Sequence, residues 1–402
     1  MLSDAHFIVR RSWRMPPLFT VQYRRHSLRS RKFSGRTLKK NSNPPGLHLL
    51  RTIKVNWWSI YGEDMPMWRV EGYGRKTLSH IYSQSLRLCP PYASPNLLMK
   101  ERPIMMTLCQ VTGPEFACNG KANTTIRHIV QHQAGLTYGP HAVTVSDVLD
   151  HRKMSKIFEE MVPLWEPGTA TGYHTLTIGF LIDQLVRRID NEARGVVDYF
   201  EQEILDKLGV EEIFIGLPNS KLNKRTTKIT LPTAEDISKE GERNPEALKR
   251  YTLSNNSHQD KLYEMWPWIQ LPDYNKLENR LLRMPSNMGI STARDIAHLH
   301  YLLIDGKILS KRFLNLMSKP VLVDEFDIVN GYKENKGLGW QYTRNPKGKW
   351  IFGHSGTGGQ NMRVDVDSKL AYAYFCNGLK IADSDNVESF SRLQTALYSC
   401  IK

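Results

Sequence analysis

Two short segments contain the residues with the clearest chemical potential, Tyr173-His-Thr175 and Gly353-His-Ser-Gly-Thr357. A tyrosine can take a proton from a nucleophile and pass it to a leaving group when nearby positive charge lowers the pKa of its phenol. A glycine-rich strand edge can present backbone N–H groups to the negative oxygen of a tetrahedral intermediate. Each segment also has an ordinary interpretation, a half-buried aromatic before a helix in the first case and a β-turn in the second. Their combination with other segments decides between these interpretations.

A third segment, Thr125 to Leu136, precedes the other two and reads TIRHIVQHQAGL. Taken alone it is an ordinary helix closing at Gly135, and His132 is interpreted as structural. In type, order and separation, however, the three segments resemble motifs of the serine β-lactamase and penicillin-binding-protein-like hydrolases. The similarity is greatest to the class C and esterase-like branch, as in animal β-lactamase domain-containing proteins. It covers roughly residues 114–378 and includes Ser286 to Arg294, which looks like a segment that lines the site in related esterases.

The resemblance implies a role for each residue of the two segments. Tyr173 stands in the family's Tyr-x-Asn motif as the proton carrier, and His354 stands in the His-Ser-Gly form of its Lys-Thr-Gly motif, beside the acyl oxygen. These two are the candidate catalytic residues, and the candidate substrate-binding residues are Thr175, Ser355, Gly356 and Thr357. Because Thr175 replaces the motif's Asn, the resemblance does not support recognition of a β-lactam amide. It implies a small-molecule ester or amide substrate, with no metal and no organic cofactor.

The family's nucleophile motif, Ser-x-x-Lys, is missing from the place where the resemblance requires it. A serine with a lysine one helical turn away should lie before Thr125, since the lysine helps to deprotonate the serine. The serines at 79, 83, 85 and 94 are followed three places on by tyrosine or leucine, and the one Ser-x-x-Lys of the chain is Ser399 to Lys402, at its C-terminal end. The sequence therefore predicts a member of a hydrolase family that is inactive as written.

A displaced reading frame is one hypothesis for this gap. If each codon is rebuilt from the last base of one codon and the first two of the next, Met105 to Thr107 forces Asp-Asp. The same shift permits Phe-Ser-Val-Thr-Lys from Tyr82 to Arg87, which restores a Ser-x-x-Lys. Residues 51–113 are accordingly interpreted as a degraded or frame-shifted part of a domain that continues over 114–402.

Three other functional classes compete with this interpretation. An α/β-hydrolase is suggested by the near Gly-x-Ser-x-Gly around Ser355, but that fold needs a histidine after the serine in the chain and none follows. A non-catalytic scaffold or binding protein that keeps the fold stays open as the alternative function. A nucleic-acid binder would depend on the basic front of the chain alone, without a recognisable module, so no nucleic acid is expected as a partner.

Several elements must position these residues. Apolar residues from Ile178 to Ile189 recur at spacings of three and four, which predicts an amphipathic helix directly after the tyrosine. A second helix is expected over Val196 to Leu208, ended by Gly209. A third should begin at Ser291 to Asp295, where Ser or Thr can cap it. The short apolar runs 350–352, 362–366 and 371–376 predict hairpin strands, whereas residues 219–275 are polar and are expected to hold insertions near a substrate entrance. The resemblance implies an α/β (α+β) fold of the β-lactamase/transpeptidase type, with an antiparallel sheet flanked by helices and an all-helical subdomain.

Most of the net positive charge lies at the front of the chain. Residues 1–54 hold nine Arg and four Lys against the single acid Asp4, a net +12 of the total +15. Such a block favours a disordered basic tail over residues 1–50, a mitochondrial transit segment, or sequence outside the natural coding frame. The five cysteines show neither CxxC pairs nor zinc spacing, which is typical of a reducing, intracellular compartment, cytoplasmic or mitochondrial. No window is apolar enough for a transmembrane segment, and the oligomeric state is left open.

Overall fold

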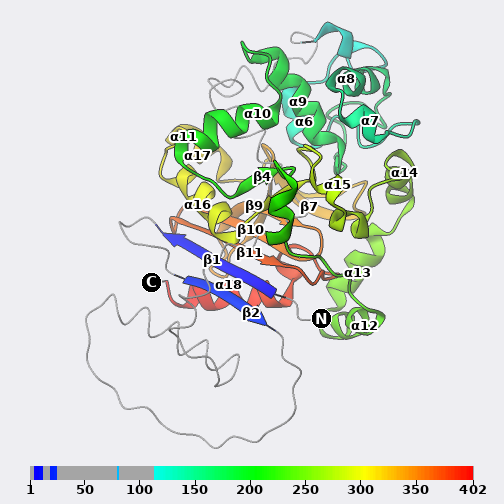
Figure 1. Cartoon of the computed structure of the whole chain (residues 1–402). Coiled ribbons are helices and arrows are strands. Elements are labelled where there is room, and N and C mark those ends of the chain that lie inside the picture. The colour runs from blue at the N-terminus through cyan, green and yellow to red at the C-terminus, as the bar shows by residue number, and fades with distance from the viewer. Residues whose placement is uncertain (1–3, 12–18, 25–78, 81–112, 402) are drawn as a thin grey trace, which may run out of the picture.

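A computed structural model describes residues 4–11, 19–24, 79–80 and 113–401. Its centre is an antiparallel sheet of eight described strands in the order β2-β1-β11-β10-β9-β8-β7-β6 (Figure 1). Three short strands form a second sheet in the order β3-β5-β4. The strands are β1 (Asp4–Arg11), β2 (Phe19–Arg24), β3 (Ser79–His80), β4 (Ile213–Ile215), β5 (Gly289–Ser291), β6 (Leu322–Asp327), β7 (Tyr332–Gly337), β8 (Trp340–Arg344), β9 (Trp350–Gly356), β10 (Gln360–Asp365) and β11 (Leu370–Cys376).

Helices lie on both faces of the large sheet, and α6 to α9 gather together above it (Figure 1). The α-helices are α6 (Ile126–Val130), α7 (Val145–Val148), α8 (His151–Glu160), α9 (Thr177–Ile189), α10 (Val196–Phe200), α11 (Asp206–Leu208), α12 (Ala234–Arg243), α13 (Pro245–Ser254), α14 (Ser257–Met265), α15 (Leu277–Arg280), α16 (Ala293–Ile304), α17 (Lys311–Met317) and α18 (Glu388–Ser399). Short 3-10 turns η1 (Pro114–Ala117), η3 (Ser220–Arg225), η4 (Leu271–Asn275) and η5 (Ser384–Asn386) and a π turn η2 (Glu201–Leu205) complete the described elements.

The composition of β11 reflects this sandwich of helices around the sheet. Successive side chains of a strand point to opposite faces, so Ala373 and Phe375 join the main core while Tyr372 and Tyr374 pack in a second core with Phe390 of α18. Both faces of β11 are covered, which is why its sequence is a continuous run of apolar and aromatic residues. Helix α16 contacts β11 and β10. The mixed architecture of helices around an antiparallel sheet confirms the predicted fold class.

The three predicted helices form where the periodicity placed them. Helix α9 buries its apolar stripe from Ile178 to Val186. The stretch Val196 to Leu208 is helical through α10, η2 and α11, and it ends at Gly209, whose φ of 65° is the left-handed conformation that glycine adopts at low cost. Helix α16 is capped by Thr292, whose side chain accepts a hydrogen bond from the backbone N–H of Asp295. The three predicted hairpin strands are β9, β10 and β11.

One local expectation needs correction. The helix that begins at the Thr125 cap ends at Val130 rather than at Gly135, because His132 takes a left-handed backbone conformation with φ 60°. Residues 219–275, which the sequence left without assigned elements, are mostly helical, with α12, α13 and α14 in succession. Their place near a substrate entrance stays a prediction. Their capping residues Thr233, Asn244 and Asn256 each accept backbone N–H groups in the first turn. These caps were readable signals that the polar composition obscured.

The two N-terminal strands also differ from the expected loose tail. Asp4–Arg11 pairs antiparallel with β11 over seven residues, from Ala5 opposite Cys376 to Arg11 opposite Leu370, and Phe19–Arg24 pairs with β1. Within residues 1–50, these two segments are therefore part of the sheet. Composition misjudged them because the free edge of β11 offers backbone hydrogen bonds that charge counting does not consider. The rest of residues 1–50 lies outside the described residues.

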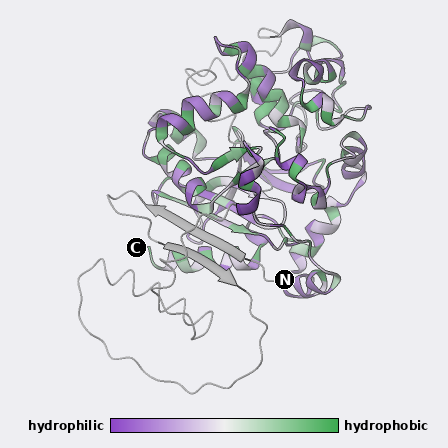
Figure 2. Ribbon diagram, viewed as in Figure 1, coloured by the Kyte–Doolittle hydropathy of each residue, from purple (hydrophilic) through white to green (hydrophobic). Residues whose placement is uncertain are grey.

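Figure 2 shows hydrophilic and hydrophobic residues side by side along most helices, as expected for helices with one buried side. In the described part of the chain, no helix has the length and hydropathy needed to cross a membrane.

Candidate active site

Tyr173 and His354 come from separate parts of the chain and meet in the folded protein. Their ring centroids lie 6.0 Å apart, and both side chains are buried. Tyr173 lies in the loop before α9, and His354 lies near the end of β9. The structure thus brings the two candidate catalytic residues together, and their catalytic roles stay a proposal.

His132 holds the loop on both sides of Tyr173. Its carbonyl oxygen accepts the N–H of Gly172 at 3.0 Å, and its Nδ1 accepts the N–H of His174 at 3.1 Å. The ring of His132 also packs against the ring of Tyr173, with centroids 4.9 Å apart. Because Nδ1 is an acceptor, these partners assign the proton of a neutral His132 to Nε2. His132 is therefore a structural residue of the site, in agreement with its interpretation from the sequence.

His174, the residue after the tyrosine, is locked in the opposite tautomer. Its Nε2 accepts the backbone N–H of Leu136 at 3.0 Å, so its Nδ1 carries the proton and donates to the Gly172 carbonyl at 2.7 Å. The buried imidazole ties the tyrosine loop to the segment that follows α6. This is a physical reason for the Tyr-His pair in the motif.

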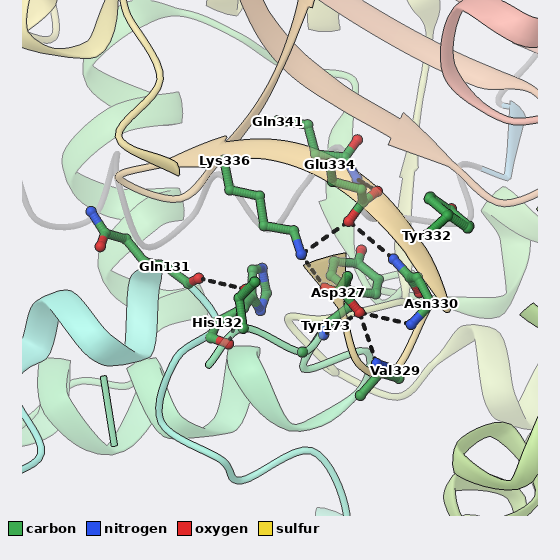
Figure 3. Close-up of polar contacts among 12 residues, drawn as sticks. Gln131, His132, Tyr173, Asp327, Val329, Asn330, Tyr332, Glu334, Lys336 and Gln341 are labelled. Atoms are coloured by element: carbon green, nitrogen blue, oxygen red, sulfur yellow. Dashed lines mark hydrogen bonds and ion pairs between the residues drawn. The ribbon is translucent and has the colours of Figure 1, made fainter. Parts of the chain in front are cut away.

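Asp327 is a third anchor of the loop, and it comes from the end of β6. Its Oδ1 accepts the backbone N–H of Tyr173 at 3.2 Å, and also those of Val329 and Asn330 at 2.9 and 2.7 Å. Figure 3 shows this carboxylate between the tyrosine loop and the β6–β7 turn. One buried carboxylate oxygen thereby fixes two chain segments more than 150 residues apart.

The His-Ser-Gly segment occupies the last residues of β9. Pairing between β8 and β9 ends at Gln341 and Gly353, so the backbone beyond Gly353 has no β8 strand partner. The side chain of Gln341 takes that place: its Oε1 accepts both the N–H and the hydroxyl of Ser355, at 3.1 and 2.8 Å. The strand edge that was expected to face an acyl oxygen is therefore capped at Ser355 by an amide.

The candidate substrate-binding residues lie in the same two segments as Tyr173 and His354. The Nδ1 of His354 lies 2.7 Å from the Ser355 carbonyl, which can only accept, so this nitrogen carries a proton. Thr175 donates its hydroxyl to the Tyr173 carbonyl at 3.4 Å. Gly356 ends β9, and Thr357 is half-buried in the turn that leads to β10. A role in substrate binding for Thr175, Ser355, Gly356 and Thr357 stays a proposal.

The segment Tyr82 to Arg87 and the Asp-Asp hypothesis at Met105 to Thr107 lie outside the described residues. Among residues that the structure does describe, no three or more His, Cys, Asp or Glu side chains are grouped so as to hold a metal ion.

Residues 110–397 match the beta-lactamase family, and the chain belongs to that family. A curated relative is the esterase/beta-lactamase LipL of Mycobacterium tuberculosis, 27% identical over 280 residues, which are 66% of this chain and 61% of that protein. The chain thus spans about three fifths of the length of this relative.

Solved structures show the same fold. A family VIII carboxylesterase superposes with a TM-score of 0.65 at 22% identity, over 81% of this chain and 84% of that one. A penicillin-binding-protein homologue from Caulobacter crescentus gives 0.63 at 24% identity, over 82% and 85%. EstA from Arthrobacter nitroguajacolicus gives 0.65 at 18% identity, over 99% and 92%. At these identities the likeness establishes the β-lactamase-type fold alone.

Sequence reasoning missed Asp327, Lys336 and Gln341. All three lie on the β6–β7–β8 strands, next to rather than inside the recognised motifs. A charged residue directly before the apolar run Gly337 to Trp340 was a signal for Lys336, because a lysine beside a buried strand requires a partner. Nothing in the local sequence indicates which residue that partner is.

Proposed function

We propose that this chain retains the proton-transfer part of a β-lactamase-type site for a small ester or amide, and does not hydrolyse such substrates. The observation that carries the proposal is the absence of Ser-x-x-Lys anywhere before Thr125. Acyl transfer in this family depends on an activated serine, and loss of the nucleophile in serine hydrolases lowers kcat by about 10⁶-fold. The adjacency of Tyr173 and His354 supports the retained part of the site.

Ser355 is not a substitute for the missing nucleophile. Its hydroxyl donates to the amide oxygen of Gln341 at 2.8 Å, and its side chain is buried. An amide oxygen is far too weak a base to remove the hydroxyl proton at neutral pH, so the contact does not activate the serine. We therefore assign Ser355 a role in shaping the strand edge.

The test compares two forms of the protein. The present chain is expressed beside a form in which the shifted frame restores Phe-Ser-Val-Thr-Lys in the segment 82–87. Each is incubated with a chromogenic short-chain ester and with a fluorophosphonate label that reacts with activated serines. We expect no label and no turnover from the present chain, and an acyl-enzyme with ester hydrolysis from the restored form.

Labelling of the present chain at any serine would refute its inertness. If the restored form is also silent, the non-catalytic scaffold becomes the better proposal, since the similarity to an esterase/beta-lactamase would then concern the fold only. A restored form carrying Tyr173→Phe serves as the matched control. It keeps the aromatic ring but removes the proton carrier, and its kcat should fall by two or more orders of magnitude, about 10²–10⁴-fold.

A further inference from the structure

A buried lysine lies between the tyrosine loop and the strand motif. The ammonium of Lys336, on β7, pairs with Oδ2 of Asp327 and lies 3.0 Å from Oε2 of Glu334. Asp327 and Lys336 are almost fully inaccessible, with 0% and 2% of their surface exposed. Figure 3 shows the lysine side chain extending from β7 toward both carboxylates. A charge in such a place needs fixed partners, because desolvation is otherwise prohibitive.

The first carboxylate leads to the tyrosine loop. While Oδ2 of Asp327 pairs with the lysine, its Oδ1 accepts the backbone N–H of Tyr173 at 3.2 Å. The parallel bridge between Thr171 and Asp327, with the N–H of Ile328 donating to the Thr171 carbonyl at 3.0 Å, keeps the two segments in register. The orientation of the Asp327 carboxylate therefore sets the position of the Tyr173 backbone.

The second carboxylate leads to the strand motif. Oε1 of Glu334 accepts a weak hydrogen bond of 3.5 Å from the Gln341 amide, whose oxygen in turn holds the N–H and hydroxyl of Ser355. Its Oε2 also accepts the Asn330 amide at 3.1 Å. Because an amide has distinct donor and acceptor ends, the contact with Glu334 turns the Gln341 oxygen toward Ser355.

The electrostatics agree with a lysine that stays charged. Burial alone would lower the pKa of Lys336, but the attraction of Glu334 and Asp327 outweighs it and raises the pKa above its ordinary value. Burial raises the pKa of Glu334, an effect opposed by Lys336 and reinforced by Asp327. The cation is thus the group that allows the buried Asp327 and the half-buried Glu334 to lie close together.

We propose that Lys336 is a positioning residue of the candidate site, acting on the tyrosine loop through Asp327 and on Ser355 through Glu334 and Gln341. The inference uses the proposed function only to name Tyr173 and Ser355 as site residues. It predicts that one cation couples two motifs that lie about 180 residues apart in the chain.

The test is amide hydrogen exchange in the full chain. This measurement needs no catalysis, so its outcome is independent of the proposed inactivity. Lys336→Met should accelerate exchange in peptides covering 170–176 and 352–358 on the order of tenfold, because both anchors lose their cation. Lys336→Arg, which keeps the charge, should restore much of the protection. Peptides from β10 and β11 should keep the exchange rates of the unaltered chain.

Lys121→Met is the matched control, since Lys121 is equally buried but donates to the carbonyls of Glu159 and Met161. It should leave both motif peptides protected. Equal acceleration in this control, or none in Lys336→Met, would overturn the proposal. If Lys336→Met does not fold, Gln341→Leu carries the test: only the 352–358 peptide should accelerate, and a change in both peptides or in neither would count against the two connections.

Discussion

At the scale of single residues, the backbone on both sides of Tyr173 is held by hydrogen-bond acceptors. The backbone N–H groups of Gly172, Tyr173 and His174 are held by the His132 carbonyl, the Asp327 carboxylate and the His132 ring. Three consecutive N–H groups with fixed acceptors leave the loop little freedom. Such restraint supports the proposed role of Tyr173 as proton carrier, because proton transfer requires the phenol within hydrogen-bonding distance of its partner.

We expect His300 to make the free energy of unfolding depend on pH. Burial lowers the pKa of His300 to about 3, while its Nδ1 donates to the Ile296 carbonyl at 2.7 Å. Between that value and the unfolded pKa of about 6.5, the unfolded chain binds a proton that the native chain does not. The stabilisation from neutral His300 is therefore complete above pH 6.5 and is lost as the pH falls. From pH 7 to pH 5 the loss in free energy of unfolding should be about 2 kcal/mol.

Urea unfolding at pH 7 and pH 5 measures this effect. The comparison is with His300→Asn, whose amide can occupy the Nδ1 position and donate to Ile296 without titrating. The variant should be less stable at pH 7, because it loses the packing of the ring against Trp340, but its stability should fall by about 2 kcal/mol less between the two pH values. Parallel pH dependence in the two proteins would disprove the assignment to His300.

At the scale of elements, the packing of α9 decides where the tyrosine loop lies. Gly179, in the first turns of α9, lies against the segment at Ser286, whose hydroxyl accepts the Gly179 N–H at 2.8 Å and donates to the Leu176 carbonyl at 2.7 Å. A Cβ on Gly179 would lie 2.6 Å from both the backbone N and the Oγ of Ser286. The helix can approach the 285–286 segment this closely only because the side chain is absent.

Gly179→Ala distinguishes packing from helix propensity. Propensity alone predicts stabilisation by about 1 kcal/mol, since alanine is the better helix former. Packing predicts destabilisation by about 1–3 kcal/mol, because backbone atoms of Ser286 must move. We expect the second result in denaturant unfolding.

The control for this prediction is Gly241→Ala in α12. There the new Cβ would meet the Leu248 side chain at 2.8 Å, and that side chain is 39% exposed and can rotate away. Unfolding measurements should show this variant as stable as the unaltered chain or slightly more stable. If both substitutions change stability in the same direction and by the same amount, the special role of the α9 contact is wrong.

At the scale of the whole molecule, the N-terminal strands extend the sheet past β11. Deleting residues 1–24 would uncover the edge of β11, along which seven residues pair with β1. An exposed apolar edge strand pairs readily with other chains, so we expect a lower unfolding midpoint and concentration-dependent association in light scattering. A deletion of residues 1–3 alone should change neither. A truncated chain with an unchanged association state and an unchanged midpoint would mean that the loose tail expected from composition was the correct description.

The sequence by itself determined the fold class, the helices α9 and α16 and the strands β9 to β11. It also identified Tyr173 and His354 as candidate catalytic residues. These features depend on local periodicity and on motif order, both of which are written along the chain. It also determined that no Ser-x-x-Lys precedes Thr125, which is the basis for the proposed inactivity.

Only the tertiary structure decided what surrounds the motifs. The contacts of Tyr173 with Asp327 and of Ser355 with Gln341 join residues from different strands and loops. Likewise, the charge of residues 1–50 predicted a loose tail, and only the pairing with β11 shows that β1 is part of the sheet. Hydrogen bonds between distant segments depend on which strand ends meet in space, and local composition holds no record of that. A buried lysine such as Lys336 can be suspected from its neighbours in sequence, but its two acids are identified only when the sheet folds.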